Sequence, residues 1–274
     1  MRIVHFSDIH AGLFPRKAAA FFDKRLLGAL NYLLCRKHAC RPERIQRLAA
    51  RLEQLAPDWV VCSGDLSCIG SPEEFALACD WLQPIRDVVA DRFIFVPGNH
   101  DAYVHDQAGK QALAKIFHEL NSRRWQLSDL PLAMSSKDAQ LIMIPGAVPV
   151  GMLRSSGRLS PDDCTRLTAI LNEPRNASNT IRIGIAHFPP CRADGRPFQA
   201  RRALDGADAI LAQLATGRLD VLLCGHVHEP FAYELPNRAT VLCAGSLTLT
   251  GSFVVLDYEP GQHWSWQFHH VDAD

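Results

Sequence analysis

The chain has 274 residues, of which 47% are hydrophobic and 21% charged, and its 29 basic and 29 acidic side chains cancel. This length and composition are typical of one large or two small globular domains, and the absence of repeats, heptads and low-complexity tracts excludes disordered, collagen-like and coiled-coil proteins. No apolar run reaches the ~20 residues that cross a bilayer, no secretory leader is recognisable, and nine cysteines without CxxC spacing indicate reduced thiols, so we expect a cytoplasmic protein.

Short apolar runs rich in β-branched residues alternate with stretches of helical periodicity. The predicted strands are 3–6, 59–62, 93–96, 141–144, 181–186, 221–224, 241–244, 253–258 and 264–269. The predicted helices are 41–55, 73–82, 110–120, 161–171 and 204–214. Near-continuous apolar strands suit sheets that are covered on both faces. Since no linker rich in Pro, Gly or Ser divides the chain, we predict one layered α/β domain over residues 1–274.

Residues 14–40 form an insert between the first two polar motifs. The segment 16–51 carries ten Lys or Arg residues against two acidic ones, a net charge of +8 that the rest of the chain balances. At helical spacing, one face of the insert is apolar and comprises Phe22, Leu26, Leu30 and Leu33. We expect a basic amphipathic helix that packs this face on the body of the protein. The alternative is a cap beside the active site that binds a lipid-linked or membrane-surface phosphate, which would make the protein peripheral to the inner face of the membrane.

Polar blocks follow the predicted strands. They are Asp8-Ile9-His10, Gly64-Asp65, Gly98-Asn99-His100-Asp101, His187 and Gly225-His226-Val227-His228. Because open α/β sheets gather ligands at the carboxyl ends of their strands, we expect these blocks to lie together. Imidazoles with carboxylates suit Mn, Fe, Zn, Ni or Co, and the lack of cysteine argues against a thiolate zinc site. Seven side chains in these blocks are candidate ligands. This is more than one ion needs, and it suits two ions that share a carboxylate. The three glycines allow a close approach of the backbone.

In this order, DIH, GD, GNHD, a lone His and GHVH resemble the calcineurin-like metallophosphoesterase superfamily from Asp8 to His228. The resemblance implies a four-layer αββα sandwich of two mixed β-sheets flanked by helices. It also implies two metal ions, the first held by Asp8, His10 and His228, the second by Asn99, His187 and His226, with Asp65 as the bridge. His100 would contact the phosphate and protonate the leaving oxygen, with Asp101 orienting it, and a metal-bound hydroxide would be the nucleophile.

Within the superfamily, the motifs are most similar to those of bacterial class III cyclic-nucleotide phosphodiesterases, so we expect a phosphomonoester or phosphodiester of a small molecule as substrate. The alternative is a diphosphate hydrolase resembling UDP-2,3-diacylglucosamine pyrophosphatases, which the basic insert favours. A DNA nuclease is disfavoured, because zero net charge does not provide the basic surface that nucleic acid needs. A catalytically silent scaffold is disfavoured as well, because every ligand position of the motif is filled.

Overall fold

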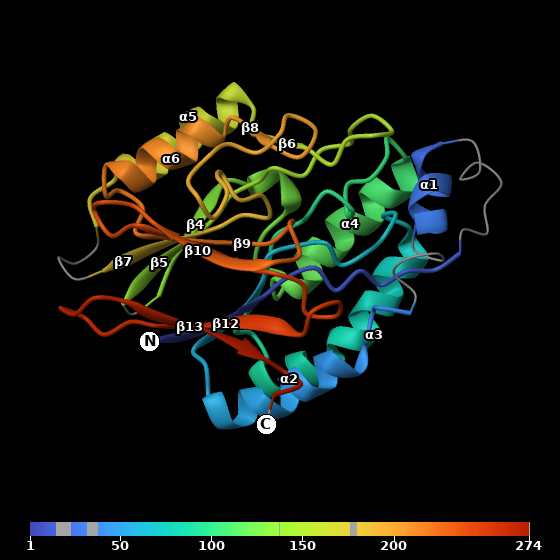
Figure 1. Cartoon of the computed structure of the whole chain (residues 1–274), viewed down its shortest axis with the longest axis horizontal. Coiled ribbons are helices and arrows are strands. Elements are labelled where there is room, and N and C mark those ends of the chain that lie inside the picture. The colour runs from blue at the N-terminus through green and yellow to red at the C-terminus, as the bar shows by residue number, and fades with distance from the viewer. Residues whose placement is uncertain (15–22, 32–37, 137, 176–179, 274) are drawn as a thin grey trace.

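Two mixed β-sheets lie between two layers of helices (Figure 1). The computed structural model describes residues 1–14, 23–31, 38–136, 138–175 and 180–273. In Figure 1, α5 and α6 cover the outer face of one sheet, whereas α2 and α3 cover the outer face of the other. The predicted four-layer αββα arrangement is therefore confirmed.

The first sheet has five strands in the order β13-β12-β1-β2-β3, and the three N-terminal strands run parallel. Their bounds are β1 Arg2–Phe6, β2 Trp59–Cys62, β3 Phe93–Phe95, β12 Ser252–Asp257 and β13 Ser265–His270. The second sheet has six strands in the order β10-β11-β9-β7-β5-β4, with β5, β7, β9 and β11 parallel. Their bounds are β4 Leu132–Ser135, β5 Ala139–Met143, β7 Ile181–Ile185, β9 Val221–Cys224, β10 Pro230–Glu234 and β11 Thr240–Ala244.

Helices α3, α4 and α5 begin at residues whose side chains cap the helix: Ser71, Asp106 and Ser160. Their bounds are α1 Lys24–Asn31, α2 Glu43–Leu55, α3 Pro72–Val89, α4 Gln107–Leu120, α5 Pro161–Asn172 and α6 Ala207–Ala215, with a 3₁₀ turn at Leu127–Asp129. Ser71 and Ser160 each accept a backbone N–H of the first turn and form capping boxes for α3 and α5. Such caps satisfy N–H groups that have no partner within the helix.

Helix α3 and the start of α6 differ from the prediction. The predicted helix ends at Leu82, whereas α3 continues to Val89 through Pro84, although proline inside a helix is normally unfavourable. Ile85 and Val89 are buried in the core, and this packing extends the helix past the proline. The predicted helix 204–214 begins three residues late, because Leu204–Asp205 forms the short strand β8, which pairs with β6, Gly157–Arg158.

The predicted orientation of the insert helix is wrong. In α1, Lys24 and Arg25 are buried, whereas Leu30 is 41% exposed, so the apolar face does not pack as a whole on the body. The two basic side chains are buried because each has a partner: Lys24 lies on an aromatic ring and Arg25 pairs with carboxylates. Phe22 and Leu33 lie outside the described residues.

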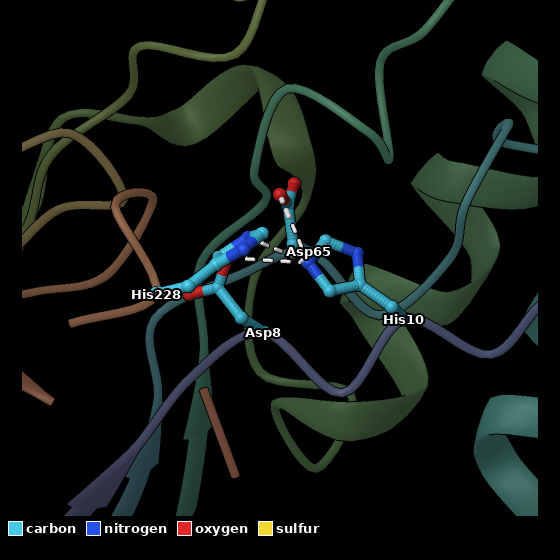
Figure 2. A group of neighbouring side chains, drawn as sticks. All are labelled: Asp8, His10, Asp65 and His228. Carbon is cyan, nitrogen blue, oxygen red and sulfur yellow. Dashed lines mark hydrogen bonds and ion pairs between the residues drawn. The ribbon is translucent and has the colours of Figure 1, made fainter. Parts of the chain in front are cut away.

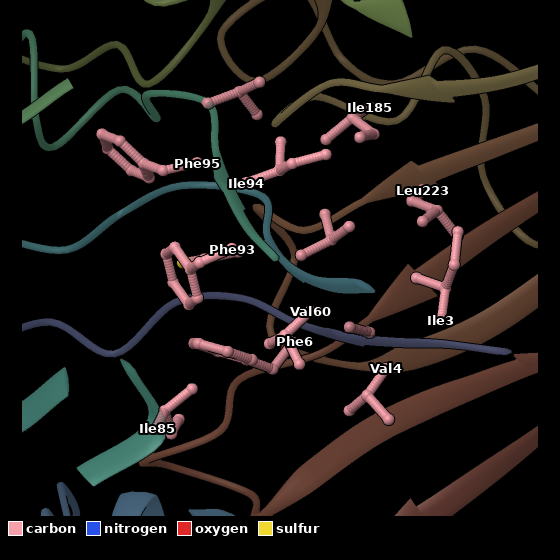
Figure 3. Packing of buried hydrophobic residues seen from close by; sticks show 14 of the residues in the cluster. Ile3, Val4, Phe6, Val60, Ile85, Phe93, Ile94, Phe95, Ile185 and Leu223 are labelled. Carbon is pink, nitrogen blue, oxygen red and sulfur yellow. The ribbon is translucent and has the colours of Figure 1, made fainter. Parts of the chain in front are cut away.

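The main hydrophobic core includes residues of both sheets and of the buried faces of α2, α3 and α4 (Figure 3). Ile3 and Phe6 of β1 belong to the same buried cluster as Ile185 of β7 and Leu223 of β9. One shared core therefore fixes the strand ends of both sheets relative to each other. The polar loops that follow these strands are fixed relative to each other for the same reason. Within the described ranges, no helix is long and apolar enough to cross a membrane.

Candidate metal centre

The polar motifs occupy the loops that follow β1, β2, β3, β7 and β9. Backbone hydrogen bonds join these loops: the Asp8 N–H donates to the Gly64 carbonyl at 3.0 Å, and the His10 N–H donates to the Asp65 carbonyl at 3.0 Å. Within the second sheet, the Gly225 N–H donates to the His187 carbonyl at 2.9 Å, and between the sheets the His226 N–H donates to Asp8 Oδ2 at 3.0 Å. The five loops therefore meet at one point, as the sequence predicted.

Four side chains form a first group of metal-ligating atoms (Figure 2): Asp8, His10, Asp65 and His228. Their ligand atoms all lie within 4.8 Å of one another. The Nε2 atoms of His10 and His228 are 2.9 Å apart, and the His228 Nε2 lies 3.2 Å from Asp8 Oδ1. Among the described residues, this buried Asp8 oxygen has no hydrogen-bond partner. A cation between these four side chains would complete the coordination of that oxygen, so the residues fit a metal ion.

Asn99, His187 and His226 form a second group beside the first. The Asn99 Oδ1 lies 2.8 Å from His226 Nδ1 and 3.2 Å from His187 Nε2. The His187 Nε2 is also 3.4 Å from Asp65 Oδ2, and this same carboxylate oxygen is 3.9 Å from His10 Nε2. Asp65 is thus the residue that both groups share.

Backbone carbonyls fix which nitrogen of each imidazole faces the centre. The Ser63 carbonyl lies 2.8 Å from His187 Nδ1, and the Arg202 carbonyl lies 3.1 Å from His226 Nε2. When His187 Nδ1 and His226 Nε2 carry the proton and donate to these carbonyls, the other ring nitrogens, His187 Nε2 and His226 Nδ1, each keep a lone pair that can bind a metal ion. Such outer hydrogen bonds are typical of metal-ligating histidines.

The electrostatics favour ionised carboxylates at this site. Burial opposes ionisation of Asp8, but the His10 and His228 imidazoles outweigh it and hold the pKa of Asp8 well below its usual range. Burial also opposes ionisation of Asp65, but the positive charge of His187 lowers the pKa of this carboxyl. Although burial opposes it, the Asp65 charge in turn raises the pKa of His187 to about 9, so a metal ion that binds Nε2 has to displace a proton from His187. Burial lowers the pKa of His226 to about 3, so its imidazole is neutral at physiological pH. Deprotonated carboxylates and a neutral imidazole are the forms that bind metal.

Close backbone approach explains the three motif glycines. Gly64 has a φ of +110°, and a Cβ there would lie 2.6 Å from the Gly98 nitrogen and 2.7 Å from His187 Nδ1. A Cβ on Gly98 would collide with the Asp65 carboxylate, and one on Gly225 would collide with the Ser7 hydroxyl. The expectation that these positions exclude a side chain is confirmed.

His100 and Asp101 lie beside the two groups, and they are connected through the backbone of residues 67–68. The Asp101 carboxylate accepts the Gly98 N–H at 2.9 Å and the Ser67 N–H at 3.0 Å. The His100 Nδ1 lies 2.6 Å from the Cys68 carbonyl. Asp101 thus acts on His100 through the backbone: it binds Ser67, and the carbonyl of the next residue, Cys68, orients the imidazole. The role of Asp101 in orienting His100 stays a prediction. A backbone carbonyl leaves no signal in the sequence.

The fold and the shared carboxylate define a class: a layered α/β protein with a buried site for two metal ions. The profile of the calcineurin-like phosphoesterase family matches residues 1–230. The chain belongs to this family. It is therefore a metallophosphoesterase, a metal-dependent hydrolase of phosphoric esters.

Individual relatives agree with this assignment. The chain is 26% identical over 237 residues, 84% of each protein, to a Synechococcus protein described as a probable cyclic nucleotide phosphodiesterase. A dimetal phosphatase from Danio rerio has the same fold with a TM-score of 0.67 at 13% identity, over 99% of this chain and 96% of that one. A purple acid phosphatase from yellow lupin superposes with a TM-score of 0.63 at 9% identity, and the match covers 99% of this chain and 51% of the phosphatase.

Proposed function

We propose that this metallophosphoesterase is a phosphodiesterase whose substrate is a small nucleotide diester, such as a cyclic nucleotide. The position of Asp65 carries the dinuclear part of the proposal, because its carboxylate oxygen faces His187 of one group and His10 of the other. The similarity to the Synechococcus phosphodiesterase supports the diester and nucleotide parts.

We assign the first ion to Asp8, His10 and His228 and the second to Asn99, His187 and His226, with Asp65 as the shared ligand. When bound, the two ions lower the pKa of water and neutralise charge on the phosphoryl group. Mn, Fe, Zn, Ni and Co all accept these ligands, and manganese and iron are the first to test.

His100 supplies the protonic chemistry in this proposal. Its Nδ1–H donates to the Cys68 carbonyl, so in the imidazolium form the proton on Nε2 is the one that would bind the phosphate or pass to the leaving oxygen. The His100 ring also lies edge-on to the His10 ring, with centroids 5.0 Å apart, which places it at the border of the first group. Asp101 supports this arrangement through Ser67, as described above.

Hydrolysis of bis-p-nitrophenyl phosphate and p-nitrophenyl phosphate, followed by cyclic nucleotides, tests the proposal. Activity should disappear after chelation, return with Mn or Fe, and be absent in Asp65→Asn whatever metal is added. Preference for the monoester would overturn the diester assignment. A metal-loaded protein that hydrolyses neither test ester nor cyclic nucleotides would instead favour the silent scaffold.

The named relatives give no support to the UDP-2,3-diacylglucosamine pyrophosphatase alternative or to a lipid-linked substrate, and we do not propose either. A cytoplasmic location stays a prediction from the sequence.

A further inference from the structure

The His100 imidazole is stacked on the ring of Tyr103. The ring centroids are 5.3 Å apart and the planes differ by 14°. Tyr103 is 7% exposed and packs in a small apolar cluster with Cys68 and Ile69, and the carbonyl of Cys68 is the partner of His100 Nδ1. The orientation of His100 therefore depends on this cluster, which contains none of the metal ligands.

Helix α1 packs on Tyr103 through two residues that are one turn apart. The Lys24 ammonium lies 4.4 Å from the centroid of the Tyr103 ring. A Cβ on Gly28 would lie 2.8 Å from the Tyr103 hydroxyl and 2.7 Å from the side chain of Ile69. Because residues four apart share a face of a helix, the face that contains Lys24 and Gly28 is shaped to the tyrosine.

The Lys24 ammonium is directed into the protein. It donates a hydrogen bond to the Arg154 carbonyl at 2.8 Å, and Lys24 as a whole is 8% exposed. Burial lowers the pKa of Lys24, although the negative charge of Asp65 opposes this shift. A lysine on an ordinary helix surface keeps its charged end in water. Lys24 instead joins α1, the loop around Arg154 and the ring on which His100 is stacked.

We propose that Lys24 is a positioning residue of the active site, which acts on His100 through Tyr103. The cation–π contact and the bond to the Arg154 carbonyl hold the tyrosine ring in place, and the ring holds the imidazole. This inference rests on the proposed function, because it needs His100 to act in turnover. It assigns part of the insert to the chemistry of the site, a role that the sequence did not reveal.

Three variants on the same helix test the proposal: Lys24→Met, Lys24→Arg and the control Arg25→Met. Arg25 is also buried, but it pairs with Asp23 at 2.8 Å and Asp106 at 3.5 Å and so anchors α1 elsewhere. We expect Lys24→Met to lower kcat about tenfold with little change in KM, because a small displacement of a catalytic group is costly. Lys24→Arg should restore most of the loss, since a guanidinium can also lie on an aromatic face and donate to a carbonyl. Arg25→Met should keep kcat within about twofold of the wild type.

Three kinetic results would overturn the proposal. They are an unchanged kcat in Lys24→Met, an equal loss in Lys24→Met and Arg25→Met, and a Lys24→Arg variant as slow as Lys24→Met. The second would show that Lys24 only anchors the helix.

NMR spectra of the histidine ring Cε1–H groups test the same inference without any substrate. The signal of His100, assigned by its loss in His100→Gln, should shift in Lys24→Met and stay in place in Arg25→Met. If the wild type hydrolyses no ester, the proposed function fails, and the NMR result still decides whether Lys24 positions His100. An unshifted His100 signal in Lys24→Met would refute the positioning role.

Discussion

Glu74 gives a stability prediction that can be calculated from its surroundings. The side chain is fully buried at the N-terminus of α3, where it accepts the Ile69 N–H at 2.8 Å and the Leu13 N–H at 3.1 Å. Burial raises the pKa of Glu74 from 4.5 to about 7, although the backbone donors oppose the rise. Since one pKa unit corresponds to 1.36 kcal/mol, ionisation of Glu74 costs the folded state about 3 kcal/mol.

The sign follows from proton linkage. The folded protein holds this proton more tightly than the unfolded chain, so the stability contributed by Glu74 falls as the pH rises from 4.5 through about 7, and the loss is complete above that value. Glu74→Gln carries no charge at any of these pH values. The difference in unfolding free energy between wild type and variant should therefore change by about 2 to 3 kcal/mol between about pH 5 and pH 8, in favour of the variant at high pH.

Urea unfolding at several pH values, followed by fluorescence, measures this difference. The contributions of the other titrating groups to the pH dependence cancel in this difference, because both proteins contain the same groups. Glu73→Gln is the matched control, since Glu73 lies in the same helical turn but is exposed. Parallel stability curves for wild type and Glu74→Gln across this range would refute the reasoning.

Three further predictions concern the metal centre. Asp65→Asn should lower the content of both metals, measured by elemental analysis, and reduce turnover to less than about one hundredth, since one ligand serves both groups; loss of only one ion would contradict the bridging assignment. His100→Ala should keep its metal while kcat falls about 10²- to 10⁴-fold, and an equal loss of metal would contradict a purely protonic role. Gly225→Ala places a Cβ 2.5 Å from Asp8 Oδ2, so thermal unfolding should show about 1 to 3 kcal/mol of destabilisation with loss of metal, and wild-type values for both would refute the steric argument.

The strands that carry the site were predictable because they are short, apolar and bounded by polar turns. The predicted bounds of Trp59–Cys62 and Val221–Cys224 match β2 and β9 at both ends. By contrast, Leu132–Ser135 and Pro230–Glu234 are half-exposed strands at the edges of the second sheet, and the apolar run in each is only three residues long. Edge strands lack that signal because one side faces solvent.

The seven candidate ligands were predictable as a set, whereas the residues that orient them were not. Cys68 and Arg202 act through backbone carbonyls, for which residue identity carries no information. Tyr103 lies two residues after Asp101, but nothing in the sequence shows that its ring is stacked on His100. The orientation of α1 was mispredicted because helical periodicity assigns basic residues to solvent, and Lys24 has buried partners from distant segments.

The backbone at the site explains why the motifs are so short. Asp8, His10, Asp65, His226 and His228 all adopt left-handed conformations, with φ between 49° and 74°. Each such residue costs of order 1–3 kcal/mol, so the surrounding structure has to impose the geometry. The shared hydrophobic core and the backbone hydrogen bonds from Asp8 to Gly64 and from His10 to Asp65 provide that constraint. In both D-x-H and H-x-H, the two outer residues adopt the strained conformation: Asp8 and His10 both lie in the first group, whereas His228 lies in the first group and His226 in the second. The short spacing of these motifs in the sequence therefore reflects a strained backbone, which the surrounding structure fixes in a conformation suited to metal binding.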